Sequence, residues 1–196
     1  MSSLRISTIV RGRRLAGTRV SYLLDPAGEG EDRASPETVV LKRWRKRRRE
    51  GWVYSGARIG PNLWRGVALV FGRTARDTCE LPLSRVVRML ERKRAALADR
   101  HYGLPSAETL HALFGALGPE RMQRLLDRHL DQARADRFGM PDLFLFSRQV
   151  ASGLLGGTHF VEVKKPGESV SADQKGEIEF LRSLGLSARV LRLIER

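Results

Sequence analysis

The chain has 196 residues and one cysteine; 41% of its residues are hydrophobic and 30% are charged, which indicates a folded domain and excludes a disordered or disulfide-stabilised chain. No apolar run approaches the roughly 18 residues that a membrane-spanning helix needs, and the N-terminus does not read as a secretory signal peptide, so we expect a cytoplasmic protein without a membrane partner. The net charge of +14 arises almost entirely from residues 1–100, which hold 23 Lys and Arg against 10 Asp and Glu, whereas residues 101–196 hold 13 against 12.

The first third of the chain predicts an extension, a linker and a helix. Residues 1–24 indicate one or two short strands, and residues 25–36 form a linker rich in proline, glycine and acidic residues. A helix is expected to begin at Ser35-Pro36-Glu37 and to run to Gly51, because a serine cap, an early proline and an early acid favour a helix start. Residues 52–72 then end in an apolar stretch that fits either a helix or a buried strand.

A strongly basic run, residues 42–49, lies inside that first expected helix. Because it covers every face of a helix, it cannot be buried, and only Trp44 is expected to anchor it to the core. Basic side chains that contact phosphates release counterions, so nucleic acid is the expected partner; a merely solubilising surface is the alternative. The expected DNA contacts are Lys42, Arg43, Arg45, Lys46, Arg47, Arg48 and Arg49, with Arg58 and Lys165 outside the run.

The second half of the chain predicts helices followed by strands. Hydrophobic residues recur at helical spacing over 82–100, 106–114 and 119–136. Strands are expected at 142–146, 159–163 and 188–194, and a helix at 171–185 that Gly185 ends. This order predicts an α/β fold: a small mixed sheet flanked by helices, with a helical and basic N-terminal half.

Acidic and basic side chains are expected to meet on two of these strands. Asp142 opens one strand, and Glu162 and Lys164, two residues apart on the next, project from one face. If the strands pair, the two carboxylates approach each other and repel unless a cation lies between them. Mg²⁺ or Mn²⁺ suits such oxygen ligands, with the carbonyl of Val163 as a further one, and Lys164 beside them suits phosphodiester hydrolysis. Taken alone, a Glu-x-Lys pair on a strand is usually a solvated ion pair.

The arrangement resembles a known nuclease core. Met140-Pro141-Asp142 followed by Glu162-Val163-Lys164 resembles the PD-(D/E)xK pattern, and the segments GMPDLFLF, FVEVKKPG and SADQ resemble its VRR-nuc branch, nearest to the nuclease domain of Fanconi-associated nucleases. The resemblance implies a nuclease domain over 37–196 with a helical insertion at about 82–136. It also implies that Asp142 and Glu162 bind metal, that Lys164 is the catalytic lysine, and that Gln174 lies near the site. Ser171 and Gln174 equally fit a helix capping box.

The resemblance also implies a glutamate from the N-terminal part of the domain. The matching stretch, Tyr54-Ser55-Gly56-Ala57-Arg58, contains no acid. Glu37, on the first expected helix, is the candidate replacement as a metal ligand. The preference of a helix N-terminus for an acid explains Glu37 equally well.

The function implied by the resemblance is metal-dependent cleavage of DNA by an endonuclease, with flapped or branched DNA as the substrate in repair and a location at the nucleoid. Three alternatives stay open at this point. The chain can be a DNA-degrading antibacterial effector, exported without a signal peptide and neutralised by an immunity protein. It can be a DNA-binding module whose site has decayed. It can also be a basic RNA-binding protein in which the motif is a coincidence. The sequence indicates no oligomeric state.

Overall fold

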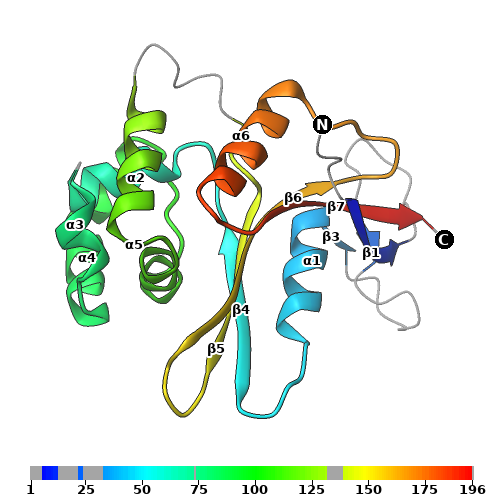
Figure 1. The fold of residues 1–196 in the computed structure, drawn as a ribbon, viewed down its shortest axis with the longest axis horizontal. Helices are drawn as coiled ribbons and strands as arrows, with labels where there is room; N and C mark the ends of the chain where they lie inside the picture. Colours follow the sequence, from blue (N-terminus) through cyan, green and yellow to red (C-terminus); the bar gives the residue numbers. More distant parts are fainter. Residues whose placement is uncertain (1–5, 13–21, 24–32, 73, 132–138, 196) are drawn as a thin grey trace.

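The computed structural model describes residues 6–12, 22–23, 33–72, 74–131 and 139–195 (Figure 1). Strands and helices alternate along the chain, with most helices in the middle third. In chain order the elements are β1 (Ile6–Gly12), β2 (Tyr22–Leu23), β3 (Arg33–Ala34), α1 (Pro36–Arg45), β4 (Trp52–Arg58), α2 (Leu63–Phe71), α3 (Ala75–Cys79), α4 (Leu83–Asp99), α5 (Ala107–Leu130), β5 (Leu143–Gln149), β6 (Leu155–Lys164), α6 (Ala172–Ser183) and β7 (Ala188–Glu195).

One five-stranded mixed sheet forms the centre of the molecule, in the order β1-β7-β6-β5-β4. The strands β4, β5 and β6 pair antiparallel, whereas β6, β7 and β1 pair parallel. The parallel pair β6–β7 is connected through α6, the crossover helix that such a pair requires. Because β1 pairs with β7, this strand joins the main sheet although it lies within the segment expected as an extension.

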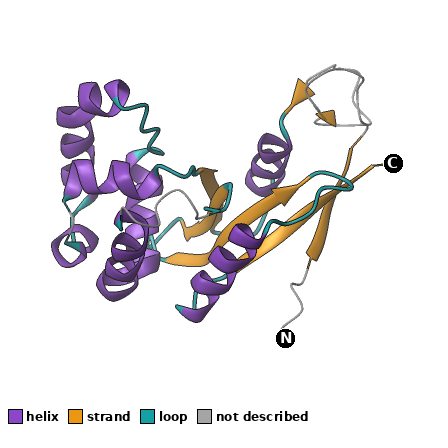
Figure 2. Cartoon of the chain, turned by 90° about the horizontal axis from the view of Figure 1, so that it is seen from above, coloured by secondary structure: helices purple, strands orange, loops and turns teal. Residues whose placement is uncertain are grey.

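Helices cover both faces of the sheet, as the view from above shows (Figure 2). On one face α1 packs against alternate strand residues, among them Leu143, Leu145 and Val161. On the other face α6 and the helices α2 to α5 enclose a larger core that contains Phe144, Phe146 and Phe160. Burial on both faces explains why β5 reads as a continuous apolar run rather than an alternating one. We refer to α2 to α5 as the helical lobe.

The predicted elements are largely present, with differences at their ends. The helix α1 ends at Arg45, not at Gly51, because the chain turns back to start β4 and because like charges one turn apart destabilise a helix. The expected linker contains β3 near its end, and residues 25–32 of it lie outside the described residues. The apolar stretch that ends at residue 72 is a helix, α2.

The two helices expected over 106–114 and 119–136 form one interrupted element, α5. Gly118 adopts a positive φ of 67° before Pro119, and the helix kinks there, since glycine tolerates that backbone conformation and proline needs no hydrogen-bond partner for its nitrogen. The end of the second prediction, 132–136, lies outside the described residues. Within the described ranges, none of the helices combines the length and apolar character that crossing a bilayer requires.

Candidate functional site

Asp142 and Glu162 lie at one end of the β5–β6 pair, as the register predicts. Leu143 faces Val161 across the antiparallel ladder, so the preceding Asp142 comes opposite Glu162. The Asp142 carboxylate accepts a hydrogen bond from the backbone N–H of Val163 at 2.8 Å, and its carbonyl accepts one from Ile59 at 2.8 Å. The start of β5 is therefore fixed on both sides, and with it the Asp142 side chain.

Glu162 and Lys164 are buried rather than solvated. Their exposed fractions are 2% and 4%, and the Lys164 Nζ lies 3.1 Å from the Glu162 Oε1. The second carboxylate oxygen, Oε2, is buried and has no hydrogen-bond partner among the residues that the structure describes. A surface ion pair would leave both oxygens to water, so the geometry excludes the solvated pair that is the usual explanation of this pattern.

Gln174 contacts the site and caps α6 at the same time. Its side-chain amide donates to the Glu162 Oε1 at 2.5 Å, while its side-chain oxygen accepts from the backbone N–H of Ser171 in a complete capping box. The backbone of Gln174 also packs against Gly139, where a β-carbon would come within 2.7 Å of the Gln174 nitrogen. The glycine of the G-x-P-D segment thus lets α6 approach the start of β5.

Glu37 and Arg58 complete the polar surroundings of Asp142. The Glu37 carboxylate lies 3.4 Å from the Arg58 guanidinium, and 17% of the Glu37 side chain is exposed. Although it comes from the opposite face of the sheet, the charge of Glu37 contributes to raising the pKa of Asp142. The structure therefore brings this N-terminal acid to the site, while Tyr54-Ser55-Gly56-Ala57-Arg58 supplies Arg58 instead of an acid.

Burial and a neighbouring negative charge disfavour the charged form of each central carboxyl. Burial raises the pKa of Asp142, with a further rise from Glu37, against the hydrogen bond from Val163 and the charge of Lys164. Burial, and next the charge of Asp142, raise the pKa of Glu162 to about 7, against the contact with Lys164. A cation between the two carboxyl groups would therefore stabilise their charged forms.

The residues present fit a divalent metal ion with few protein ligands. The Glu162 Oε2 and the Asp142 carboxylate are hard oxygen donors. The backbone of Val163 contacts the Asp142 carboxylate through its N–H, so its carbonyl oxygen is a third donor nearby. Among the described residues, no three histidine, cysteine, aspartate or glutamate side chains form a closed metal cluster. Two carboxylates are sufficient for Mg²⁺, which usually keeps several of its waters.

Glu168 is a site residue that the sequence analysis misses. Its carboxylate lies 3.6 Å from the Lys164 Nζ and also accepts a hydrogen bond from the backbone of Lys165. Arg192 on β7 holds the same turn by donating to the carbonyls of residues 165 and 168. The sequence does not predict this contact between Lys164 and Glu168, because it forms only if the Pro166-Gly167 turn folds back towards β6.

A family model described as the VRR-NUC domain matches residues 81–193, which is more than half of the chain. The chain belongs to the VRR-NUC family. The match includes Asp142, Glu162, Lys164 and Gln174, and it confirms the family resemblance that these segments indicate. No curated protein matches the chain in sequence.

One solved structure shows the same overall fold as this VRR-NUC protein. The chain is similar to paFAN1 bound to 5′ flap DNA with a 2-nucleotide flap and a gap, with a TM-score of 0.53 and 16% identity over 99% of this chain and 38% of that one. A second paFAN1 complex, with a 1-nucleotide flap, gives a TM-score of 0.48 and 18% identity over 85% of this chain and 36% of that one. The chain therefore spans under two fifths of the length of these proteins. The first likeness confirms the predicted PD-(D/E)xK-like fold.

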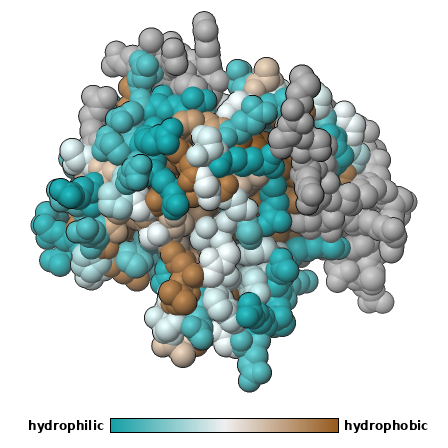
Figure 3. Space-filling view, in the orientation of Figure 1, coloured by the Kyte–Doolittle hydropathy of each residue, from teal (hydrophilic) through white to brown (hydrophobic). Residues whose placement is uncertain are grey.

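The basic run of this VRR-NUC protein lies at the opposite end of α1 from Glu37. All of its basic residues are exposed, and hydrophilic residues gather over that end of the molecule (Figure 3). The Arg47 guanidinium lies 5.0 Å from the Trp44 ring centre, and that of Arg49 lies 4.9 Å from the Trp52 ring centre. Arg45 donates to the carbonyl of Gly56 at 2.7 Å. The aromatic rings thus hold two cations in place at the surface.

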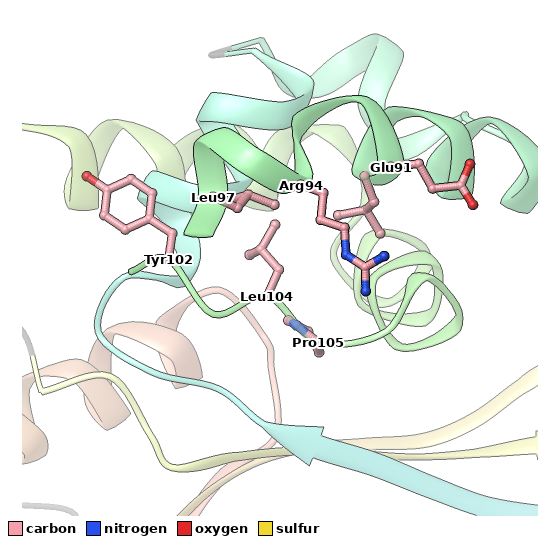
Figure 4. Close-up of a pocket in the computed structure, with 7 residues that line it drawn as sticks. Glu91, Arg94, Leu97, Tyr102, Leu104 and Pro105 are labelled. Atoms are coloured by element: carbon pink, nitrogen blue, oxygen red, sulfur yellow. The ribbon is translucent and has the colours of Figure 1, made fainter. Parts of the chain in front are cut away.

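A cavity of about 310 Å³ opens in the helical lobe (Figure 4). Asp142 and Glu162 do not line it. It lies between α4 and the segment before α5, and its wall combines leucine side chains with Glu91, Arg94 and Tyr102. None of the predicted site residues contributes to it. We therefore keep the cavity separate from the site on the sheet.

A buried ionic cluster joins the helical lobe to α6. Glu177 is fully buried; its two oxygens contact the Nε2 of His129 at 2.8 Å and the Nε of Arg128 at 3.0 Å. Burial alone would raise the pKa of Glu177, but the hydrogen bonds and charges of His129 and Arg128 lower it overall. Because α6 also carries Gln174, this cluster fixes the helix that contacts Glu162.

Replacing Glu177 with glutamine should destabilise the protein in a pH-dependent manner. Since the pKa of Glu177 is lowered in the folded state, its stabilising contribution is complete well above the ordinary value of 4.5 and disappears as the pH falls through the folded value. Urea unfolding at pH 7 should show a loss of about 3 kcal/mol for Glu177→Gln, and the loss should be smaller at a pH below the ordinary value of 4.5. An equal loss at both pH values would contradict the cluster as described.

Proposed function

We propose that the chain is a metal-dependent endonuclease that hydrolyses DNA phosphodiester bonds. The single observation that supports this most is the buried Glu162 oxygen, which has no partner in the described part of the chain and lies next to Asp142 and Lys164 on rigid strands. An unpaired buried carboxylate oxygen is costly and calls for a cation. Membership of a nuclease family supports the reaction class.

We assign the residues the following roles. Asp142, Glu162 and the carbonyl of Val163 hold Mg²⁺ or Mn²⁺. Glu37, which does not form a three-carboxylate cluster with them among the described residues, joins as a further ligand only when the ion is bound. When bound, this ion supplies a more acidic water and neutralises negative charge on the phosphate. Lys164 is placed to orient the attacking water and to stabilise charge that develops on the phosphate oxygens. Gln174 keeps the Glu162 carboxylate oriented, because its amide donates to the oxygen that Lys164 also contacts.

We infer that the basic surface binds the DNA backbone. The helix α1 extends from Pro36, next to Glu37, to Arg45 in the basic run, which corresponds to about 13 Å along the helix axis. One duplex can therefore contact the basic run and the site at Asp142 and Glu162 together. The paFAN1 structures contain 5′ flap DNA, which supports flapped or branched DNA as the substrate of this chain. The proposed contacts are Lys42, Arg43, Arg45, Lys46, Arg47, Arg48, Arg49, Arg58 and Lys165. A nuclease domain over 37–196 belongs to the same proposal, with β1 from the preceding segment as an edge strand of its sheet.

Purified protein with Mn²⁺ should nick supercoiled plasmid DNA, and Lys164→Ala should lower the nicking rate at least about 100-fold, as expected for loss of a group that stabilises transition-state charge. Gel electrophoresis of the plasmid over time gives both rates. Lys175→Ala, which removes an exposed lysine of α6, is the matched control and should retain the wild-type rate. Equal rates for wild type and Lys164→Ala would refute the enzymatic proposal.

Mn²⁺ should also stabilise the folded protein in the absence of DNA. At about 100 times its dissociation constant the ion contributes about 2.7 kcal/mol, which corresponds to a rise of about 5–10 °C in melting temperature for a chain of this size. Glu162→Gln should abolish the rise, and Glu37→Gln should reduce it. Glu50→Gln alters an exposed acid next to the basic run and should leave the rise unchanged; a full rise for Glu37→Gln would exclude Glu37 as a ligand.

Removing a basic side chain at the end of α1 should weaken DNA binding in a salt-dependent way. Arg47→Ala should lower affinity for any duplex sequence and reduce the slope of log K against log salt concentration by about one, because one phosphate contact is lost. Fluorescence anisotropy at several salt concentrations measures this slope. Arg92→Ala, an exposed arginine of α4, serves as the control, and identical slopes for the two variants would show that Arg47 makes no phosphate contact.

A further inference from the structure

Large hydrophobic side chains are exposed at one end of the sheet. Among the described residues these are Val53, Val150 and Leu154, with exposed fractions of 56%, 66% and 63%. Val53 lies near the start of β4, and Val150 and Leu154 lie in the turn between β5 and β6. We call these three residues the sheet tip. Single exposed hydrophobic residues are ordinary, but the gathering of all three at one end is a surface feature.

Backbone hydrogen bonds hold the sheet tip rigid. The N–H of Val150 donates to the carbonyl of Gly51 at 2.8 Å, which joins the β5–β6 turn to the start of β4. The N–H of Gln149 donates to the carbonyl of Leu154 at 2.9 Å and closes the turn itself. Val53 pairs with Arg148 on β5, so it lies diagonally beside Val150 on the same face of the sheet. The apolar side chains are therefore presented on a stiff support.

The sheet tip lies next to the basic end of α1. The segment that leads from α1 into β4 carries Arg47, Arg48 and Arg49, and the hydrogen bond from Val150 to Gly51 joins this segment to the β5–β6 turn. The Arg49 side chain lies over the ring of Trp52, which projects from the face of β4 opposite to Val53, so these arginines border the sheet tip from the other face of the sheet. Glu50 is the one acidic residue of the segment from 46 to 53. This combination of a small apolar tip and a dense cationic border complements a polyanion that also offers apolar surface. Nucleic acid with an accessible base step has both properties.

We propose that the sheet tip inserts at an opened base step of DNA, such as the junction of a flapped duplex, while the adjacent arginines bind the flanking phosphates. The inference rests on the proposed function and makes it more specific, since it assigns a part of the chain that recognises a junction. Apolar wedges that enter between base pairs unstack them, and the flanking phosphate contacts offset the cost of unstacking. At a flap or gap one stacking partner is already missing, so insertion costs less there than in a continuous duplex.

The test uses the full chain without divalent cations, so that no cleavage occurs, and two DNA probes. One is a duplex with a 5′ flap that carries 2-aminopurine at the junction, and the other is a continuous duplex with 2-aminopurine at the same position. The variant Val150→Ser/Leu154→Ser removes the apolar side chains at exposed positions. The matched control Val150→Ile/Leu154→Met keeps them apolar.

With the wild type and with the control variant, 2-aminopurine fluorescence at the flap should rise severalfold on saturation, because the base loses its stacking partner. The serine variant should abolish this rise and lower the preference for flapped over continuous duplex about tenfold, since two apolar contacts are lost. Circular dichroism establishes that the serine variant is folded. An unchanged rise with a folded serine variant would overturn the inference.

Two further outcomes separate this inference from its alternatives. If sedimentation shows a wild-type dimer that Val150→Ser/Leu154→Ser converts to a monomer, the sheet tip is an interface between two copies of the chain, and the inference is wrong. If the wild type nicks plasmid DNA but does not raise the fluorescence, the proposed function stands and the wedge is refuted. If it raises the fluorescence without nicking, the wedge stands and the proposed endonuclease is refuted.

Discussion

The account depends on one electrostatic constraint, which is the burial of two neighbouring carboxyl groups with less compensation than they need. One Glu162 oxygen contacts both Lys164 and Gln174, and the other has no partner within the described ranges. Asp142 lies opposite, and its charge helps to raise the pKa of Glu162 to about 7. In a low-dielectric environment such an arrangement is unfavourable by itself, and a divalent cation relieves both the repulsion and the missing contact.

The fold supports this strained arrangement from three sides. The strands β5 and β6 are buried on both faces, which makes the positions of Asp142 and Glu162 rigid. The helix α6 approaches closely because Gly139 leaves room for its first turn, and Glu177 ties the same helix to the helical lobe. From the opposite face, α1 brings Glu37 to Asp142, while β4 contributes Arg58 at its end. The surrounding packing and hydrogen bonds thus stabilise a site whose own buried charges are destabilising.

The sequence predicts the centre of this site better than its surroundings. Alternation along β6 and the strand start at Asp142 are local properties, so the meeting of Asp142, Glu162 and Lys164 follows from a single hairpin register. The extent of burial of Glu162 and Lys164 does not follow, because it depends on α6 and the helical lobe packing over them. The capping box at Ser171 is readable from four residues, whereas the second role of Gln174 depends on the tertiary approach allowed by Gly139.

Elements that depend on long-range contacts are those that the sequence leaves open or misplaces. The end of α1 at Arg45 is decided by the return of the chain into β4, and helix signals alone extend it to Gly51. Glu168 contacts Lys164 only when the turn between them forms, and Glu177 contacts His129 only when α6 packs against α5. Glu37 is identified as a candidate only through the family resemblance, and the structure adds its electrostatic contact with Asp142.

The most direct test of the central claim is to locate Mn²⁺ in crystals of the protein by anomalous X-ray scattering. The account predicts one strong peak between Asp142 and Glu162, with oxygen atoms of both side chains and the carbonyl of Val163 at about 2.0–2.4 Å. A peak elsewhere, or none at saturating Mn²⁺ while the Glu162 oxygen keeps a protein partner, would show that these carboxyls do not form a metal site.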